Sequence, residues 1–303
     1  MTLRQVRMLL ALAALWGASF LFIRVAVDEL GPVVLADARL LLAAAALAPF
    51  VLRGLRRTAP LRRYLFLGAI NAALPFTLIA AAETRIDASL AAILNASTPL
   101  FAALVAAAVG DERMTGRRAF GLALGMGGVA LVVGLAHVEA DLAFFLAAAA
   151  SLGAALCYAV GTTYVKHKMT GEPPGTLALF QTAAAGLVLL PAIAVAQPPH
   201  APDAGDLAAV AALAIGSTSL AYLLYFRLVA EVGPTSTLTV TFLVPVFGVL
   251  WATIFLGEQL GAGTVAGGAL ILASVAFVTN TRVPSLVRRR QSPAGAATRS
   301  RSR

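Results

Sequence analysis

The chain has 303 residues, of which 60% are hydrophobic and only 12% are charged, whereas a soluble domain usually carries about 25% charged residues. With a mean hydropathy of +0.87, so much apolar surface requires lipid as its solvent, which excludes an ordinary soluble domain. The net charge of +9 would suggest nucleic acid for a soluble protein, but the placement of the basic residues indicates a membrane surface instead, and we expect no nucleic-acid partner.

Apolar stretches recur along almost the whole chain. A transmembrane helix needs about 20 mostly apolar residues. The candidate spans are 8–27, 33–51, 64–82, 88–109, 118–136, 142–165, 175–196, 207–230, 235–256 and 262–280. The sequence therefore predicts an all-α integral membrane protein with ten transmembrane helices.

The first stretch could also be interpreted as a cleaved signal peptide, because Arg4 and Arg7 precede its apolar residues. It continues through Trp16 and Phe20 without a clear small-x-small cleavage site, and further spans follow. We expect a retained first span, preceded by residues 1–7 as a cytoplasmic N-terminus.

Most of the 23 lysines and arginines fall in alternate segments between the spans. The segments on one side hold Arg4, Arg7, Arg53, Arg56, Arg57, Arg62, Arg63, Arg113, Arg117, Arg118, Lys166, Lys168, Arg227 and the arginines of 282–303. Cytoplasmic loops are enriched in Lys and Arg. The pattern predicts a multi-pass protein of the bacterial inner membrane with both termini in the cytoplasm, and residues 281–303 as a disordered basic tail.

The chain contains an internal repeat with a shift of 146 residues. Under this shift Pro99 coincides with Pro245, Phe101 with Phe247, Glu112 with Glu258, and Gly121 with Gly267. The repeat predicts two related halves, 8–136 and 142–280. Because each half holds five spans, and five is odd, the second half enters the membrane in the opposite sense to the first.

Such inverted repeats are typical of secondary transporters, in which rocking of one half against the other exposes a site at the bilayer midplane to either side. A duplicated scaffold with no transport role is the alternative. Glu112 and Glu258, each just past a span, fit a structural or gating role.

Several segments resemble the paired signature of EamA-type carriers in the drug/metabolite transporter superfamily. They are 86–101 (IDASLAAILNASTPLF), 110–113 (GDER), 245–247 (PVF), 256–258 (LGE), 16–20 (WGASF) and 39–42 (RLLL). The resemblance covers residues 8 to about 280, and it implies ten helices and the carriage of amino acids or other metabolites, more often outward than inward.

Three spans contain a proline, which lacks the N–H that would bond the carbonyl four residues earlier. Pro75 frees the carbonyl of Asn71, Pro99 that of Asn95, and Pro245 that of Thr241. Under the 146-residue shift Asn95 coincides with Thr241 and Asn71 with Ser217. Because an unsatisfied carbonyl is tolerated in a membrane only inside protein or beside a wet cavity, we expect kinks at the prolines and a central cavity lined by these four polar residues.

That prediction has an alternative, in which the polar residues pack helices together or satisfy the kinks locally. Further lining candidates are Trp16 with Phe20, Tyr158 with Thr162, and Thr218 with Tyr222. The members of each pair lie four residues apart and share a helix face. They would give apolar walls with few polar groups, as small-molecule pockets have, although helix packing would also explain them.

Arg39 lies inside the second span, where an arginine costs about 2.5 to 3.5 kcal/mol. We expect it to face the protein interior with a partner, which could be a carboxylate, a freed carbonyl or an anionic group of the solute. Asp37, two residues away on the same helix, is poorly placed to be that partner. The alternative is an arginine that ties helices together or extends to the surface.

The sequence predicts neither an enzyme nor a cofactor. Cys157 is the single cysteine, so an intramolecular disulfide is excluded. The histidines His137, His167 and His200 fall in different links, which suggests no metal site, and no phosphate-binding loop of the Walker type is present.

The sequence thus favours a secondary carrier that moves amino acids or similar amphipathic solutes by alternating access, and the family resemblance implies export. The alternatives are a passive channel, a non-transporting scaffold or, less favoured, a membrane-embedded enzyme. Proton coupling is possible, with Asp37 as its best candidate. Gly121-x-x-x-Gly125 and Gly263-x-x-x-Gly267 let helices approach closely, so a monomer and a homodimer both remain open.

Overall fold

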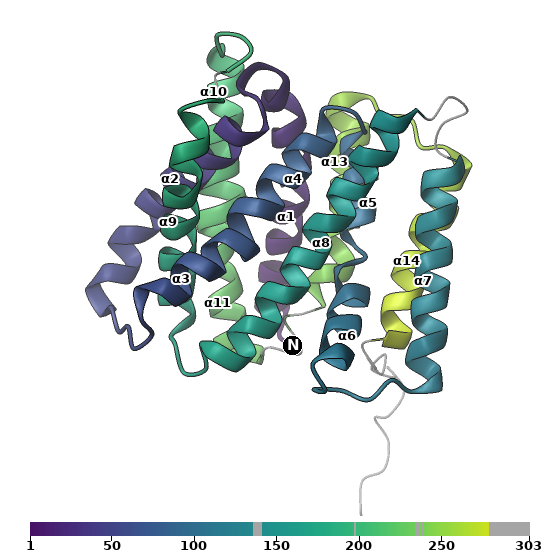
Figure 1. Cartoon of the computed structure of the whole chain (residues 1–303), viewed down its shortest axis with the longest axis horizontal. Coiled ribbons are helices and arrows are strands. Elements are labelled where there is room, and N and C mark those ends of the chain that lie inside the picture. Colours follow the sequence, from purple (N-terminus) through teal and green to yellow (C-terminus); the bar gives the residue numbers. More distant parts are fainter. Residues whose placement is uncertain (136–140, 197, 234–236, 238, 279–303) are drawn as a thin grey trace, which may run out of the picture.

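The computed structural model describes residues 1–135, 141–196, 198–233, 237 and 239–278. The predicted tail, 281–303, lies outside the described residues, as do position 136 of the fifth predicted span, most of 235–238, and 279–280 of the tenth. All regular structure in the described part of the chain is helical, and the helices run between the two ends of one bundle (Figure 1).

The first half contains α1 (Leu3–Leu30), α2 (Pro32–Val51) with a short 3-10 turn at Leu52–Gly54, α3 (Leu61–Gly68), the π-helical η2 (Ala69–Ala73), α4 (Leu74–Glu83), α5 (Ala88–Asn95), α6 (Thr98–Ala108) and α7 (Gly116–Leu135). The second half contains α8 (Leu142–Lys168), α9 (Pro174–Ile193), α10 (Ala204–Ala211), the π-helical η3 (Ala212–Leu220), α11 (Ala221–Val232), α13 (Val240–Leu256) and α14 (Ala262–Val278).

Eight of the resulting helical segments are long and apolar enough to cross a membrane, and α13 and α14 are shorter apolar helices of 17 residues each. The third span consists of α3, η2 and α4, the fourth of α5 and α6, and the eighth of α10, η3 and α11. The predicted class, an all-α membrane protein with ten helical spans, is confirmed.

Local sequence signals mark the ends of several helices. The side chains of Thr2 and Gln5 form a capping box at the start of α1, and Asp203 forms one with Asp206 at the start of α10. Gly31 has a φ of 74° between α1 and α2, a conformation that favours glycine. Gly31 thus lets the chain reverse between α1 and α2, and the capping boxes fix where α1 and α10 begin.

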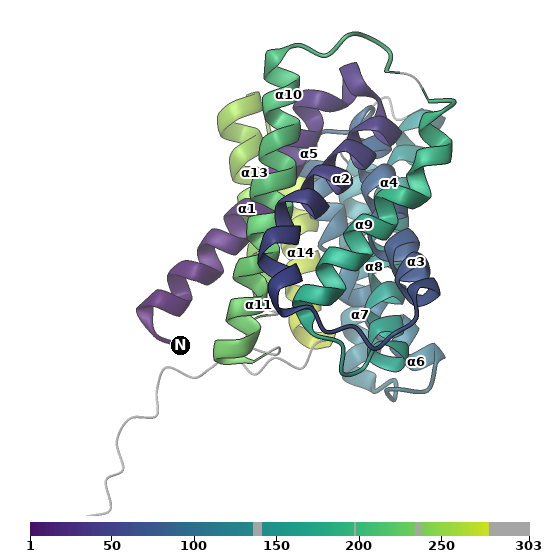
Figure 2. The ribbon, with the colours of Figure 1, turned by 90° about the vertical axis from the view of Figure 1, so that its left-hand side faces the viewer.

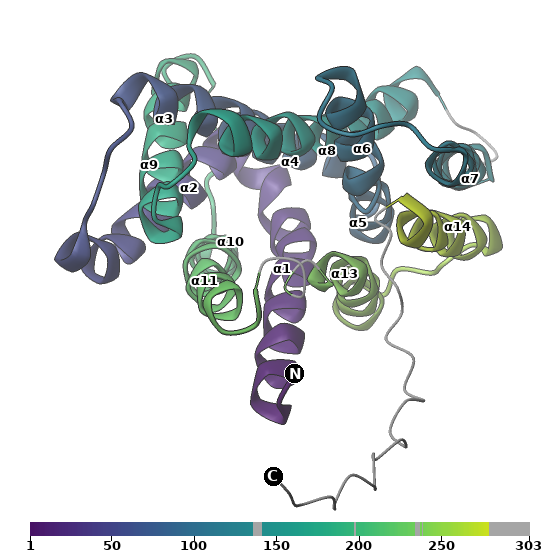
Figure 3. The same ribbon diagram turned by 90° about the horizontal axis from the view of Figure 1, so that it is seen from below.

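The packing of the helices follows the internal repeat. The first span, α1, packs against α13 of the second half, and its counterpart α8 packs against α6 of the first half. The fifth and tenth spans, α7 and α14, lie side by side at one edge of the bundle (Figure 3). Exchanging the halves thus maps the contact of α1 with α13 onto that of α8 with α6, as an inverted repeat requires.

Glycines allow α7 and α14 to pack closely within one chain. A Cβ placed on Gly128 would lie 2.8 Å from the carbonyl oxygen of Gly267, and one placed on Gly267 would lie 2.6 Å from that of Gly128. A Cβ on Gly125 would meet the side chains of Leu100 and Ser274. The small residues of these two helices therefore serve contacts inside the chain.

The two ends of the bundle differ, and we call them the N-terminal end, where α1 begins, and the opposite end. The first turns of α1 project from the bundle at the N-terminal end (Figure 2). The links 52–60, 109–115 and 169–173 lie at this same end (Figure 1), and basic side chains stand in or beside each of them, among them Arg57, Arg113 and Lys168. At the opposite end, a cluster of buried apolar side chains, among them Ile23, Val27, Ile79 and Leu90, fills the space between the helices.

The link 169–173 at the N-terminal end is fastened by a buried carboxylate. Glu172 accepts hydrogen bonds from the backbone N–H of Thr58 at 2.7 Å and of Ala59 at 2.5 Å, from the Thr58 hydroxyl, and from the Tyr64 hydroxyl at 2.5 Å. Burial by itself would raise the pKa of Glu172, but these hydrogen bonds outweigh it and lower the pKa to about 2. The ionised carboxylate therefore joins the two halves at this end.

The π-helical segments η2 and η3 occupy equivalent places in the two halves. Shifting η2 by 146 residues gives 215–219, which lies within η3. Short π-helical turns occur frequently at functional sites. The sequence analysis predicted a kink at Pro75 but no π-helix in the eighth span, which has no proline at the equivalent position, Ala221.

Candidate substrate cavity

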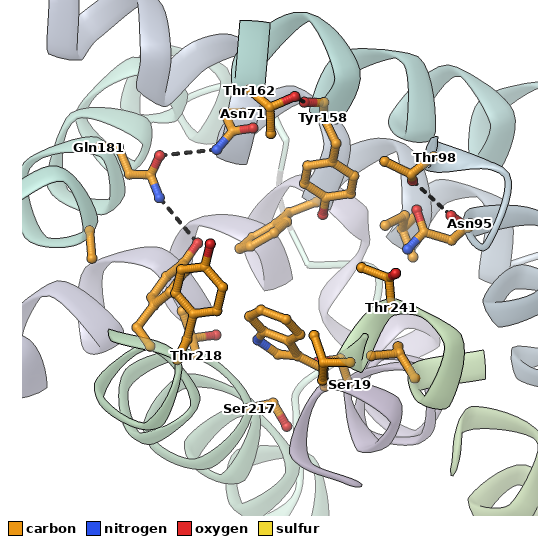
Figure 4. Close-up of a pocket in the computed structure, with 18 of the residues that line it drawn as sticks. Ser19, Asn71, Asn95, Thr98, Tyr158, Thr162, Gln181, Ser217, Thr218 and Thr241 are labelled. Carbon is orange, nitrogen blue, oxygen red and sulfur yellow. Dashed lines mark hydrogen bonds between the residues drawn. The ribbon is translucent and has the colours of Figure 1, made fainter. Parts of the chain in front are cut away.

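A cavity of about 510 Å³ lies between the two halves. Its lining comes from α1, α2, η2, α4, α5 and α6 of the first half, and from α8, α9, η3, α11 and α13 of the second. No described residue of α7 or α14 contributes to it. The cavity thus lies where the repeats face each other (Figure 4).

The cavity reaches the N-terminal end of the bundle and stops short of the opposite end. On α9, which starts at the N-terminal end, the lining residues run from the exposed Pro174 only as far as Gln181. On α1 the last lining residue is Ile23, seven residues before the helix ends. In the described part of the chain, the structure is therefore accessible from one end and closed at the other.

The ten residues predicted to bind solute all line this one cavity. They are Trp16, Phe20, Arg39, Asn71, Asn95, Tyr158, Thr162, Ser217, Tyr222 and Thr241. Of the predicted hinge prolines, Pro99 and Pro245 also line it. Pro75 is near the start of α4, directly after η2, and does not line the cavity, nor does Asp37, which is buried at 4% exposure.

Arg39 is buried and points into the cavity with no acidic partner. Its Nε donates to Oγ1 of Thr218 at 2.9 Å, and its guanidinium carbon lies 3.8 Å from the ring centroid of Phe76. No carboxylate of the described residues lies within ion-pairing distance of Arg39. The hydroxyl and the aromatic ring orient the guanidinium, and the remaining N–H donors of Arg39 can meet an anionic group.

A chain of side-chain hydrogen bonds crosses the cavity wall between the two halves. Nδ2 of Asn71 donates to Oε1 of Gln181 at 3.1 Å, and Nε2 of Gln181 donates to the hydroxyl oxygen of Tyr222, also at 3.1 Å (Figure 4). The sequence analysis missed Gln181. Its signal was present, because an amide inside an apolar span is expensive in lipid and so faces the protein interior.

The position of Asn71 depends on a glycine in α8. A Cβ placed on Gly161 would lie 2.3 Å from Oδ1 and 2.7 Å from Cβ of Asn71. Only glycine leaves room for this amide, so Gly161 positions Asn71 in η2.

Three acceptor oxygens beside the cavity are buried and have no hydrogen-bond partner among the described residues. They are Oδ1 of Asn71, Oδ1 of Asn95 and Oγ of Ser217. Buried polar atoms are nearly always hydrogen-bonded in native proteins. The residues that carry these oxygens line the cavity, and acceptors without a partner fit a ligand that donates N–H or O–H groups.

The freed carbonyl of Asn95 is satisfied locally, which was the alternative to a role in the cavity. It accepts a hydrogen bond from Oγ1 of Thr98 at 2.7 Å, so the hydroxyl replaces the N–H that Pro99 lacks. The helix is interrupted there, between α5 and α6. The amide of Asn95, rather than its freed carbonyl, is therefore the group offered to the cavity.

Aromatic rings form the apolar walls. The rings of Trp16 and Tyr225 have centroids 5.7 Å apart, and those of Tyr222 and Phe226 are stacked with centroids 5.9 Å apart. Phe20 adds a further ring from α1. An apolar lining with a few placed polar groups is the usual composition of a small-molecule site.

Comparison with known proteins agrees with this architecture. A solved crystal structure superposes on the chain with a TM-score of 0.65 at 18% sequence identity, covering 91% of this chain and 97% of that one, which supports the fold alone. A probable terminal-alkyne amino-acid exporter of Streptantibioticus cattleyicolor is 29% identical over 91% of this chain and 92% of its own length.

A probable amino-acid metabolite efflux pump of Salmonella typhimurium is 27% identical over 88% of this chain and 91% of its own length. The model of the EamA-like transporter family matches the chain twice, over residues 4–134 and 145–280. These are transporters and not enzymes. With two matches that follow its two halves, the chain is a multi-pass membrane protein that belongs to the EamA-like transporter family.

Proposed function

We propose that the chain is a secondary carrier that moves amino acids and similar amphipathic metabolites by alternating access. The observation that carries the proposal is the cavity between two inverted halves, which reaches the N-terminal end and is closed at the opposite end. A carrier needs such a one-sided state, since a site open to both ends at once would leak. Rocking of the halves would close the N-terminal end and open the other.

The groups around the cavity match the parts of an amphipathic amino acid. The guanidinium of Arg39, which has no acidic partner among the described residues, suits a carboxylate. The unpartnered oxygens of Asn71, Asn95 and Ser217 suit the N–H donors of an ammonium group. The rings of Trp16 and its neighbours suit an apolar side chain.

The proposed orientation places the N-terminal end in the cytoplasm of a bacterium, because lysines and arginines gather in the links at that end and in the helix turns beside them. The membrane is then the inner membrane, and both termini are cytoplasmic. The proposed direction is export, which is the activity in the names of the two relatives described above. The cavity in this structure would then load from the cytoplasm.

Counterflow in sealed proteoliposomes tests the proposal. Vesicles loaded with an unlabelled amino acid should accumulate the same amino acid in labelled form, and the rate should saturate with concentration. A set of amino acids, their decarboxylated amines and their carboxylate analogues would be compared. Linear uptake without saturation would indicate a channel, and recovery of a chemically altered product would indicate an enzyme, so either result would refute the carrier.

A labelling experiment in intact cells tests the orientation. A cysteine at Ser302 of a Cys157→Ala variant should resist a membrane-impermeant maleimide until the membrane is opened. Labelling of that cysteine in intact cells would refute the proposed topology.

A further inference from the structure

Glu83 is a buried acid that the cavity does not use. It is the last residue of α4, its exposed fraction is 0%, and neither carboxylate oxygen has a hydrogen-bond partner among the described residues. Burying an ionised carboxylate without a partner costs several kcal/mol. A closed structure of this kind therefore favours Glu83 with its proton attached.

The charged groups around Glu83 provide no counter-ion. Those that act on it electrostatically are Glu258, Arg24 and Arg39. Arg24 is paired with Asp28 at 2.8 Å, and Arg39 is bonded to a hydroxyl on η3. In the part of the chain that the structure describes, neither arginine lies within ion-pairing distance of Glu83, so no basic group pairs with its carboxylate.

Helix α2 packs against α4 and carries the buried Asp37, whose Oδ1 lies beside Gly186 of α9. The remaining elements next to Glu83 add no titratable partner. Helix α8 packs against α4 and has no titratable side chain between Leu142 and Leu156, its half toward the opposite end. Helix α5 has none at all. In the link 84–87, the side chains of Arg85 and Asp87 are exposed to solvent.

Glu258 fastens the opposite end of the cavity. It follows α13, and its Oε1 and Oε2 accept hydrogen bonds from the backbone N–H groups of Ala88 at 2.9 Å and Ser89 at 3.0 Å, at the start of α5. A carboxylate is favourable at a helix N-terminus. The contact holds the second half of the chain against the first, only four residues before Ala92 of the cavity lining.

Glu83 lies on the closed side of the cavity. Ile79 lines the cavity, and Glu83 follows one helical turn later on the same face of α4. Helix α4 runs toward the opposite end (Figure 1), and Glu83 is its last residue, beyond the part of α4 that lines the cavity. Water can therefore reach Glu83 from the opposite side once that end opens.

We propose that Glu83 is a protonation switch for the opposite end of the cavity: its neutral form allows that end to close, and its ionised form holds it open. Ionisation would add a negative charge close to Glu258 and would require water around Glu83. Both effects would weaken the hydrogen bonds between Glu258 and the start of α5. The proton comes from water on the opposite side and returns there. This inference rests on the proposed function for the opening step itself.

Accessibility of a cysteine at the closed end tests the switch without any solute. In a Cys157→Ala background, Val27→Cys places a thiol in α1 where the native side chain is 1% exposed. The rate at which an impermeant maleimide labels this cysteine from the opposite side is measured at each pH. It is divided by the labelling rate of Ala201→Cys, an exposed position. The ratio corrects for ionisation of the thiol. With Glu83 present, the ratio should rise between pH 5 and pH 8, at most about tenfold per pH unit for one proton.

The variants give opposite expectations. Glu83→Gln, which mimics the neutral acid, should give a low ratio that does not change with pH, and Asp87→Asn, which removes a nearby exposed carboxylate, should behave like the parent. Glu83→Ala serves as a second variant, and its ratio should also be independent of pH. A ratio that still rises with pH in both Glu83 variants, or one that is flat in the parent, would overturn the switch.

Counterflow of a labelled amino acid separates this proposal from the previous one. Acid pH on the opposite side should slow exchange by the parent but not change the residual exchange by Glu83→Gln. If labelling depends on Glu83 but no solute is exchanged, the carrier assignment fails and the switch stands. If exchange saturates normally and both proteins respond equally to pH, the switch fails and the carrier assignment stands.

Discussion

The Nε atom of Arg39 donates a hydrogen bond to Oγ1 of Thr218 at 2.9 Å, and this bond joins the two halves of the chain inside the cavity. The hydroxyl of Thr218 donates in turn to the carbonyl of Leu213, also at 2.9 Å, within η3. The guanidinium is thus fixed by the π-helical segment of the other repeat. A relative movement of the halves would change the geometry around the proposed carboxylate site.

Replacing Arg39 with Gln should weaken the binding of solutes that carry a carboxylate. Loss of hydrogen bonds to a charged group costs about 1.5 to 3 kcal/mol, so the KM for counterflow should rise roughly tenfold to a hundredfold. The corresponding decarboxylated amine serves as the control, and its KM should change little. An equal loss for acid and amine would show that Arg39 supports the structure and does not bind the carboxylate.

Replacing Asn95 or Thr241 with Leu should abolish counterflow while the protein remains folded. Each change fills part of the cavity and removes a polar group from its lining. Thr77→Val is a matched control, because the Thr77 hydroxyl bonds the Ala73 carbonyl at 2.9 Å and does not line the cavity. Monodisperse elution in detergent checks the fold, and full activity of both leucine variants would count against the cavity.

Gly161→Ala should displace Asn71, because the added Cβ would overlap its side chain. Overpacking of this kind costs about 1 to 3 kcal/mol, so we expect a lower unfolding temperature and reduced counterflow. Gly153→Ala on the same helix is the control, since its Cβ would lie 3.6 Å from the nearest neighbour, Leu78. Equal behaviour of the two variants would show that the amide of Asn71 moves without cost.

Glu172→Gln should destabilise the protein at neutral pH by about 2 kcal/mol, because the charged acceptor of several hydrogen bonds is lost. The folded pKa of Glu172, about 2, lies below the ordinary value of 4.5. The stabilisation is therefore complete above pH 4.5 and is lost as the pH falls toward 2. Thermal unfolding of both proteins between pH 7 and pH 3 should show a difference that shrinks with acid, and a constant difference would contradict the assignment.

The architecture was largely predictable because the apolar stretches, the repeat and the alternation of basic links each constrain it separately. The polar residues of the cavity were predictable for a similar reason, since lipid tolerates Asn71 or Arg39 only inside the protein. The π-helical η3 was not predictable, because no proline or other local signal marks it. The burial of Glu83 was not predicted either: Glu83 directly follows the predicted span 64–82, and only the packing of α4 shows that its side chain is covered.

The contact between α1 and α13 brings both tryptophans of the chain to the same region. Trp16 lines the cavity. The indole N–H of Trp251 donates at 3.0 Å to the carbonyl of Ala14, which lies two residues before Trp16 on α1. Intrinsic fluorescence of the unmodified protein therefore comes from indoles at the cavity wall and at the contact beside it. A quenching titration or a shift of the emission maximum would report solute occupancy directly, without a dye or a radiolabel.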